Sequence, residues 1–193
     1  MDLTQSVILD TETSGLGKKD QIIEVSIIDG KTGLVLLDTL VKPTCVINKH
    51  AAAVHGITDE MVDDAPSWAE IHSLVCRILH GMTLVAYQSD FDLRMLKQTA
   101  KAHNLLLPDI ASECAMRWLH SYQVTPKNPK LKWPKLTEAA KQYNVTLKGT
   151  AHRALCDTIM TRDVILAVRL EDQSEPDAGE TTIPETTIPE KKT

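Results

Sequence analysis

The N-terminal part of the chain contains three short apolar runs rich in β-branched residues, and this feature constrains the fold most strongly. The runs cover Ser6–Asp10, Gln21–Ile28 and Leu34–Val41, and glycines lie between them. Short runs of this kind predict β-strands. Residues 29–33, Asp-Gly-Lys-Thr-Gly, are typical of a tight connection. The second and third strands are therefore expected to form an antiparallel hairpin.

After Pro43 the apolar residues follow a helical period, except for a fourth expected strand at Thr83–Tyr87. A fifth strand or a short connector is expected near Leu107–Ala111. Helices are expected at 48–55, after the N-cap Thr58, and at 67–80, 91–104, 113–122, 137–143 and 153–170. The chain has only three Trp, three Tyr and one Phe, so its core must be largely aliphatic. This pattern is typical of an α/β protein.

The length of 193 residues fits one globular domain, predicted to span residues 1–170, followed by an acidic tail at 171–193. The tail holds seven acidic residues and two lysines, so it carries the whole formal charge of −5. The neutral domain argues neither for nor against binding to nucleic acid. The tail repeats Thr-Thr-Ile-Pro-Glu at 181–185 and 186–190 and is expected to be disordered. It is either solvated chain without a specific task or a tether for a partner.

The cysteines are scattered without a Cys-x-x-Cys pair and are expected to be reduced; they are Cys45, Cys76, Cys114 and Cys156. No basic N-terminal segment precedes an apolar run, and no apolar stretch approaches the roughly 20 residues needed to cross a bilayer. These features predict a soluble, intracellular protein, cytoplasmic in location and without a membrane partner.

The first apolar run ends in two carboxylates, Asp10 and Glu12. Side chains alternate along a strand, so both carboxylates lie on one side of the sheet, in a geometry suited to a metal ion. The pair alone is a weak signal and needs partners from elsewhere in the chain. Asp92 is one candidate because it follows the fourth strand; alternatively, it only compensates the dipole at a helix start.

His152 and Asp157 are two further candidates, near the start of the last helix. Five residues along a helix turn the side-chain direction by about 140°, so the two would not share a helical face. Both can point at one centre if His152 precedes the helix and Asp157 lies in its first turns. Otherwise His152 is a surface or capping histidine.

Four segments of the chain resemble the successive motifs of the DnaQ-like, DEDDh-type 3′–5′ exonuclease family. They are 10–16 (Asp-Thr-Glu-Thr-Ser-Gly-Leu), 54–58 (Val-His-Gly-Ile-Thr), 91–92 (Phe-Asp) and 152–157 (His-Arg-Ala-Leu-Cys-Asp). The resemblance extends from about residue 6 to residue 168, in the family's order and spacing. It implies a ribonuclease H-like α/β fold, in which a mixed sheet of about five strands is flanked by helices.

The resemblance also implies the chemistry of the site. Two Mg²⁺ or Mn²⁺ ions would lie about 4 Å apart, and Asp10 would bridge them. The metal ligands would be Asp10, Glu12, Asp92 and Asp157. His152 would take a proton from the attacking water, a role that suits a side chain titrating near neutrality.

The same resemblance assigns four residues to the substrate. Thr13 and Leu16 would line the pocket for the 3′-terminal nucleotide, with Leu16 against a base. His55 and Phe91 would lie near that nucleotide. Alternatively, the His-Gly-Ile-Thr turn at His55 is structural and presents Thr58 as a helix cap.

A proline-broken loop at 124–135 combines basic residues with an aromatic one. Its basic residues surround Trp133 and are Lys127, Lys130, Lys132 and Lys135. Such a loop could hold a single-stranded backbone and stack a base through Lys130, Lys132 and Trp133. Alternatively, the loop is solvated and Trp133 anchors it to the core.

The chain departs from the family pattern at 87–89, where Tyr-Gln-Ser replaces the His-Asn-Ala of many relatives. Asp92 is kept, so the change bears on substrate preference rather than on activity. The opening motif and the His-Gly-Ile-Thr turn are most similar to those of the polymerase III epsilon and exonuclease X branches of the family. This implies release of nucleoside 5′-monophosphates from DNA 3′ ends, with single-stranded or frayed ends preferred, as in proofreading or repair.

Two other functions stay open. One is a 3′–5′ exoribonuclease of the ribonuclease T or oligoribonuclease kind, with RNA as the partner instead of DNA. The other is a non-catalytic module that binds a DNA polymerase or nucleic acid. The presence of all five site residues argues against this second alternative, because a silent domain has no need for them.

Overall fold

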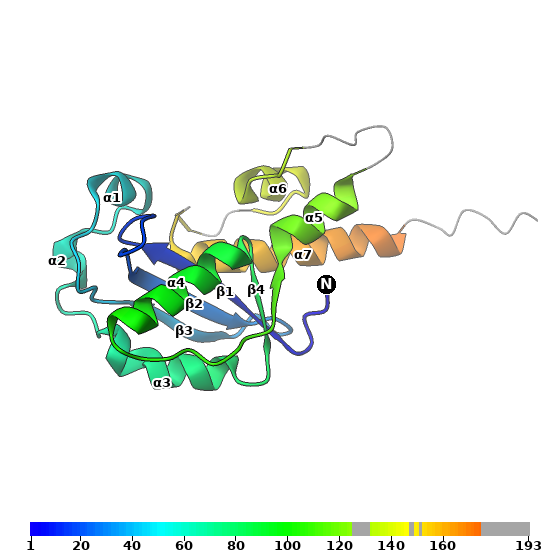
Figure 1. The fold of residues 1–193 in the computed structure, drawn as a ribbon. Helices are drawn as coiled ribbons and strands as arrows, with labels where there is room; N and C mark the ends of the chain where they lie inside the picture. The colour runs from blue at the N-terminus through cyan, green and yellow to red at the C-terminus, as the bar shows by residue number, and fades with distance from the viewer. Residues whose placement is uncertain (125–131, 147–148, 151, 175–193) are drawn as a thin grey trace, which may run out of the picture.

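The computed structural model describes residues 1–124, 132–146, 149–150 and 152–174, with a single sheet at its centre (Figure 1). The strands are β1 (Ser6–Thr13), β2 (Ile22–Asp29), β3 (Val35–Leu40), β4 (Thr83–Ala86) and β5 (Ser112–Cys114). They lie in the order β3-β2-β1-β4-β5. β1 is antiparallel to β2 and parallel to β4, β2 is antiparallel to β3, and β4 is parallel to β5. The predicted mixed sheet of five strands and its hairpin are therefore confirmed.

Helices cover both faces of the sheet. They are α1 (Lys49–His55), α2 (Asp59–Val62), α3 (Trp68–Leu79), α4 (Ser89–Ala102), α5 (Ala115–Gln123), α6 (Leu136–Gln142) and α7 (Ala154–Ser174). Val7 and Leu9 of β1 pack in one core with α3 and α4, whereas Ile8 packs in another with α5 and α7. Figure 1 shows α3 and α7 on opposite sides of the strands. Because side chains alternate along β1, its residues enter two different cores, and the even-numbered ones face α7.

The segment predicted as a fifth strand or a connector at 107–111 is a connector, and β5 begins at Ser112. Pro108 explains why this apolar stretch is not a strand, since it lacks the N–H that a sheet ladder requires. Leu107 and Ile110 instead pack singly against the core that contains α3 and α4. The stretch therefore contributes to the core without joining the sheet.

Helix boundaries differ from the predicted ones by a few residues. α4 begins at Ser89 rather than Phe91, and α7 continues to Ser174, past the predicted end at Leu170. Most of the predicted acidic tail, residues 175–193, lies outside the described part of the chain. Among the described residues, no helix combines the length and apolar character needed to cross a membrane.

Candidate active site

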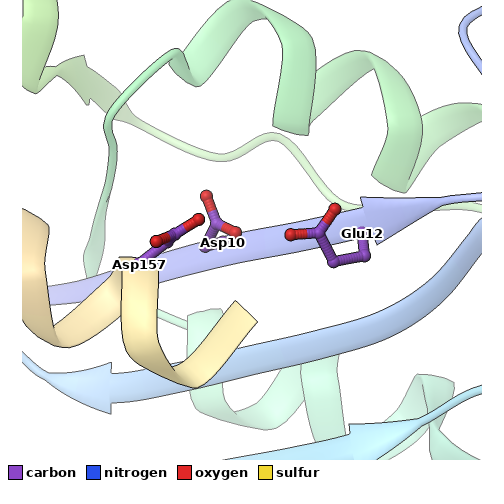
Figure 2. A group of neighbouring side chains, drawn as sticks. All are labelled: Asp10, Glu12 and Asp157. Atoms are coloured by element: carbon purple, nitrogen blue, oxygen red, sulfur yellow. The ribbon is translucent and has the colours of Figure 1, made fainter. Parts of the chain in front are cut away.

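Two carboxylates of β1 lie next to a third carboxylate on α7. Asp10 and Glu12 extend from β1 on the side that α7 covers, and Asp157 lies in the first turn of α7. One carboxylate oxygen from each of the three residues lies within 4.8 Å of the other two. Figure 2 shows the three side chains directed toward a common space between the strand and the helix.

Asp92 reaches the same site from the start of α4, directly after β4. Because β4 runs parallel to β1, both strands end at the same edge of the sheet. Asp92 is buried and accepts a hydrogen bond of 2.9 Å from the hydroxyl of Thr11. Thr11 lies between Asp10 and Glu12, so this hydrogen bond ties α4 to the acid pair.

His152 precedes α7 in a left-handed backbone conformation, with φ of 60°. Its backbone N–H donates a hydrogen bond of 3.2 Å to Oδ2 of Asp157. His152 thus precedes the helix and Asp157 lies in its first turn, which is the arrangement predicted to let both residues point at one centre. The five predicted site residues line a single cavity of about 900 Å³: Asp10, Glu12, Asp92, His152 and Asp157.

Burial and mutual repulsion make these acids hard to ionise. Burial, followed by the charge of Asp92, raises the pKa of Asp10 well above its usual value. Burial, followed by the charge of Asp157, raises the pKa of Glu12 to about 8. Burial also raises the pKa of Asp92 to about 7, and it raises the pKa of Asp157. A nearby cation would favour the charged forms, and carboxylate oxygens are the ligands that hard divalent cations prefer.

Sequence reasoning missed an ion pair between the partly exposed Arg153 and the buried Glu24, which holds the end of the His152 turn. Glu24 lies on β2 directly opposite Glu12 and is only 4% exposed. Nε and Nη2 of Arg153 donate to Oε1 of Glu24 at 3.0 and 2.5 Å, and the N–H of Ala154 donates to Oε2 at 2.9 Å. The available signal was an acid within the apolar run of a central strand, since a buried charge requires a partner.

A second cavity, of about 690 Å³, lies beside the first. It is lined by the four residues predicted to contact the terminal nucleotide, Thr13, Leu16, His55 and Phe91. Leu16 is 77% exposed, whereas His55 is buried and its Nδ1 accepts a hydrogen bond of 3.0 Å from the N–H of Ile57. This hydrogen bond favours a structural role for the His-Gly-Ile-Thr turn. The predicted cap is not formed, because the Thr58 side chain makes no capping hydrogen bond to α2.

The predicted basic loop is only partly within the described residues, since Lys127 and Lys130 lie outside them. Trp133 is 53% exposed, and its ring stacks on the ring of His120 with 4.1 Å between the centroids. Trp133 and Lys135 line the cavity that contains the carboxylates, whereas Lys132 is exposed and does not line it. The structure therefore brings the indole, but not Lys132, into the candidate active site.

Comparison with known proteins gives matches over most of the chain. The family model named RNase_T and described as exonuclease matches residues 7–165. The chain is 42% identical over 169 residues to an uncharacterized exonuclease, CP81, of Escherichia phage 186, covering 84% of this chain and 87% of that protein. It is 25% identical over 200 residues to the DNA polymerase III subunit epsilon of Escherichia coli, covering 94% of this chain and 82% of that protein.

Solved structures share the fold. The structure of exonuclease X in complex with 5′ overhanging duplex DNA superimposes with a TM-score of 0.63 and 25% identity. That superposition covers 87% of this chain and 92% of exonuclease X. The predicted ribonuclease H-like arrangement of a mixed sheet between helices is therefore confirmed.

Proposed function

The chain belongs to the exonuclease family that matches it over residues 7–165, and from this premise we propose a metal-dependent 3′–5′ exonuclease that acts on DNA. It would release nucleoside 5′-monophosphates, with single-stranded or frayed 3′ ends preferred. The observation that carries the proposal is the approach of Asp10, Glu12 and Asp157 to within 4.8 Å of one another. Asp92 and His152 line the same cavity.

The donor set suits two Mg²⁺ or Mn²⁺ ions. Among the described residues, the acids of β1 and α7 form the cluster that could hold a metal ion, and Asp92 adds a fourth carboxylate beside it. Bound cations would supply the positive charge that polarises the scissile phosphate and stabilises the leaving oxygen. The residues that would hold the ions are Asp10, Glu12, Asp92 and Asp157.

His152 is proposed as the general base. Its side chain lines the cavity, and its backbone is fixed to Asp157, so the imidazole lies beside the carboxylates. An imidazole accepts a proton from water near neutral pH, which generates the nucleophile for an in-line attack on phosphorus. The 3′-terminal nucleoside would occupy the second cavity, against Leu16, His55 and Phe91.

Support for DNA as the substrate comes from relatives. The exonuclease X structure holds duplex DNA with a 5′ overhang, and the E. coli relative is a DNA polymerase subunit. A DNA polymerase is accordingly proposed as a partner. RNA is the alternative substrate, and the change at 87–89 bears on this choice.

The proposal is tested by offering 5′-labelled single-stranded DNA, matched and mismatched duplex DNA, and RNA, with Mg²⁺, with Mn²⁺ or with a chelator. We expect a ladder of shortened 5′-labelled products, faster for DNA than for RNA and absent with the chelator. Faster shortening of RNA would favour the exoribonuclease alternative. No shortening of any substrate would favour the non-catalytic module.

A further inference from the structure

The cavity that contains the carboxylates has a second wall, formed by residues 133–137 at the start of α6. We propose that this wall binds the nucleobase immediately upstream of the scissile phosphodiester, with Trp133 as the stacking surface and Tyr87 as the residue that positions it. The proposal rests on the proposed function and concerns the strand that stays bound after cleavage.

The larger cavity contains the proposed catalytic centre, and the second cavity adjoins it there. Both are lined by Thr11, Glu12 and Phe91, so they meet at the acid pair of β1. A phosphodiester held at these carboxylates joins two nucleotides, and one of them would occupy the cavity of Leu16 and His55. The other nucleotide must then extend into the cavity of about 900 Å³, which Trp133 also lines.

Trp133 has the geometry of a stacking surface. Its ring lies nearly parallel to that of His120, at 18° and with 4.1 Å between centroids, so one face is supported by α5. The residue is nevertheless 53% exposed and lines the cavity. Stacking on an indole tolerates any base, which is what an enzyme that shortens arbitrary sequences requires.

Basic groups accompany the indole. Lys135 is exposed and lines the same cavity, as does Arg117, which forms an ion pair with Asp90. These cations would attract the phosphates of the upstream strand. The wall thus combines an aromatic surface with positive charge, as single-stranded DNA requires.

Tyr87 fixes this wall to the sheet. It directly follows β4, and its carbonyl accepts hydrogen bonds from the N–H of Met116 at 3.0 Å and from Sγ of Cys114 at 3.3 Å. Its hydroxyl donates a hydrogen bond of 2.8 Å to the carbonyl of Pro134, the residue after Trp133. Burial raises the pKa of this hydroxyl, so it remains a donor at neutral pH. The Tyr-Gln-Ser segment at 87–89 therefore has a specific structural consequence in this chain.

Two substrates distinguish an effect on binding of the upstream base from an effect on the catalytic centre. A single-stranded DNA oligonucleotide has an upstream base, whereas the p-nitrophenyl ester of thymidine 5′-monophosphate has a terminal nucleoside and a chromogenic leaving group but no upstream nucleotide. Trp133→Ala is expected to raise KM for the oligonucleotide about tenfold, since a base–aromatic stack is lost. Trp133→Phe should restore most of that loss. Neither variant should change kcat/KM for the ester.

Tyr87→Phe removes only the hydroxyl and is expected to raise KM for the oligonucleotide several-fold, with the ester again unaffected. Tyr122→Phe is the matched control, because Tyr122 lies on α5 away from the cavity lining. An unchanged KM for the oligonucleotide in Trp133→Ala would overturn the proposal. So would an equal loss with both substrates, because the wall would then only support the catalytic centre.

Failure of the proposed function is recognised separately, as a wild-type protein that cleaves neither substrate. In that case fluorescence anisotropy of a labelled oligonucleotide with Ca²⁺ still decides the question. About tenfold weaker binding by Trp133→Ala supports the stacking wall, and equal binding rejects it.

Discussion

Arg153 follows His152 directly and is held by the carboxylate of Glu24 on the neighbouring strand β2, on the face of the sheet that α7 covers. Glu24 accepts hydrogen bonds from the Arg153 guanidinium and from the N–H of Ala154, so it fixes the chain between the proposed base and α7. The pair lies 129 residues apart in the sequence. Its geometry indicates a positioning role, in which Glu24 and Arg153 act through His152 without touching the substrate.

Arg153→Ala is therefore expected to lower kcat by about tenfold or more with little change in KM, because the imidazole loses its fixed position. It should also leave Glu24 buried without its ion pair and lower the free energy of unfolding by about 1–3 kcal/mol. Steady-state kinetics and urea unfolding measure the two effects. Arg153→Lys keeps the charge but not the forked geometry, so an intermediate kcat is expected. Unchanged kcat in Arg153→Ala would contradict the positioning role.

His152→Ala is expected to lower kcat by about 10²–10⁴-fold, the usual contribution of a positioned general base. The side chain is exposed, so the midpoint of thermal unfolding should not change. His80→Ala, at the exposed end of α3, is the matched control and should keep full activity. A His152→Ala variant with wild-type kcat would exclude this residue as the base.

The acid cluster predicts that the metal-free protein becomes less stable as pH rises. Asp10, Glu12 and Asp92 have folded-state pKa values above their usual ones, to about 8 for Glu12 and about 7 for Asp92. Between the usual and the raised pKa the unfolded chain has lost these protons and the folded chain has kept them. The stabilisation is thus complete below the usual pKa and is lost as pH rises through about 8.

Thermal unfolding in a chelator should therefore show a lower midpoint at the alkaline end of this window than at its acid end. Mg²⁺ should restore more stability at the higher pH, because it favours the charged carboxylates. Asp10→Asn should weaken the pH dependence while abolishing cleavage, whereas Asp64→Asn, at an exposed position that does not line the cavity, should change neither. A midpoint of thermal unfolding that does not depend on pH, either in chelator or in Mg²⁺, would show that the acids do not repel one another.

At the level of elements, variants in the turn after α1 can distinguish a structural role, expected for Gly56, from a role in binding substrate, proposed for His55. Gly56 has φ of 73° and donates to the carbonyl of Ala52, and an added Cβ would meet no atom within 4 Å. Gly56→Ala should thus cost only the conformational strain, about 1 kcal/mol in the free energy of unfolding. Its KM should stay unchanged, while His55→Ala should raise KM for DNA. Gly56→Asn, which tolerates this conformation, should lose less stability.

Local patterns predicted most elements, because β1 and β2 are short apolar runs rich in β-branched residues and α3 repeats its apolar residues at helical spacing. The prediction at 107–111 offered a strand or a connector, and Pro108 decides for the connector by removing a donor. Asp10, Glu12, His152 and Asp157, which share one cavity, could be selected as candidates because they stand in short motifs. Pairings between distant segments were not, since no local pattern links Glu24 to Arg153 or Tyr87 to Pro134.

At the scale of the whole molecule, the site lies where the parallel strands β1 and β4 end and where α4 and α7 begin. β1, α4 and α7 contribute the acids from different parts of the chain, and the antiparallel strand β2 adds the buried Glu24 that holds the turn before α7. The catalytic geometry therefore depends on the sheet order rather than on any one loop.

Residues 175–193 lie outside this architecture as described, and their composition predicts an electrostatic effect on DNA binding. They hold five acidic residues and two lysines, so truncation after Ser174 changes the formal charge from −5 to −2. Because the truncated chain repels DNA less, its Kd for single-stranded DNA should be a few-fold lower than that of the full chain at low salt. At 1 M salt, where charges more than about 3 Å apart are screened, the two Kd values should be equal. The unfolding midpoint should stay unchanged.

Anisotropy titrations at two salt concentrations measure this effect. The matched control keeps the full length and replaces the five acids, Glu175, Asp177, Glu180, Glu185 and Glu190, by their amides. If charge alone acts, this variant should bind as the truncated chain does. A truncated protein that unfolds at a lower temperature would instead mean that the segment packs on the domain. Tighter binding by the truncated chain but not by the amide variant would point to steric exclusion from the DNA site.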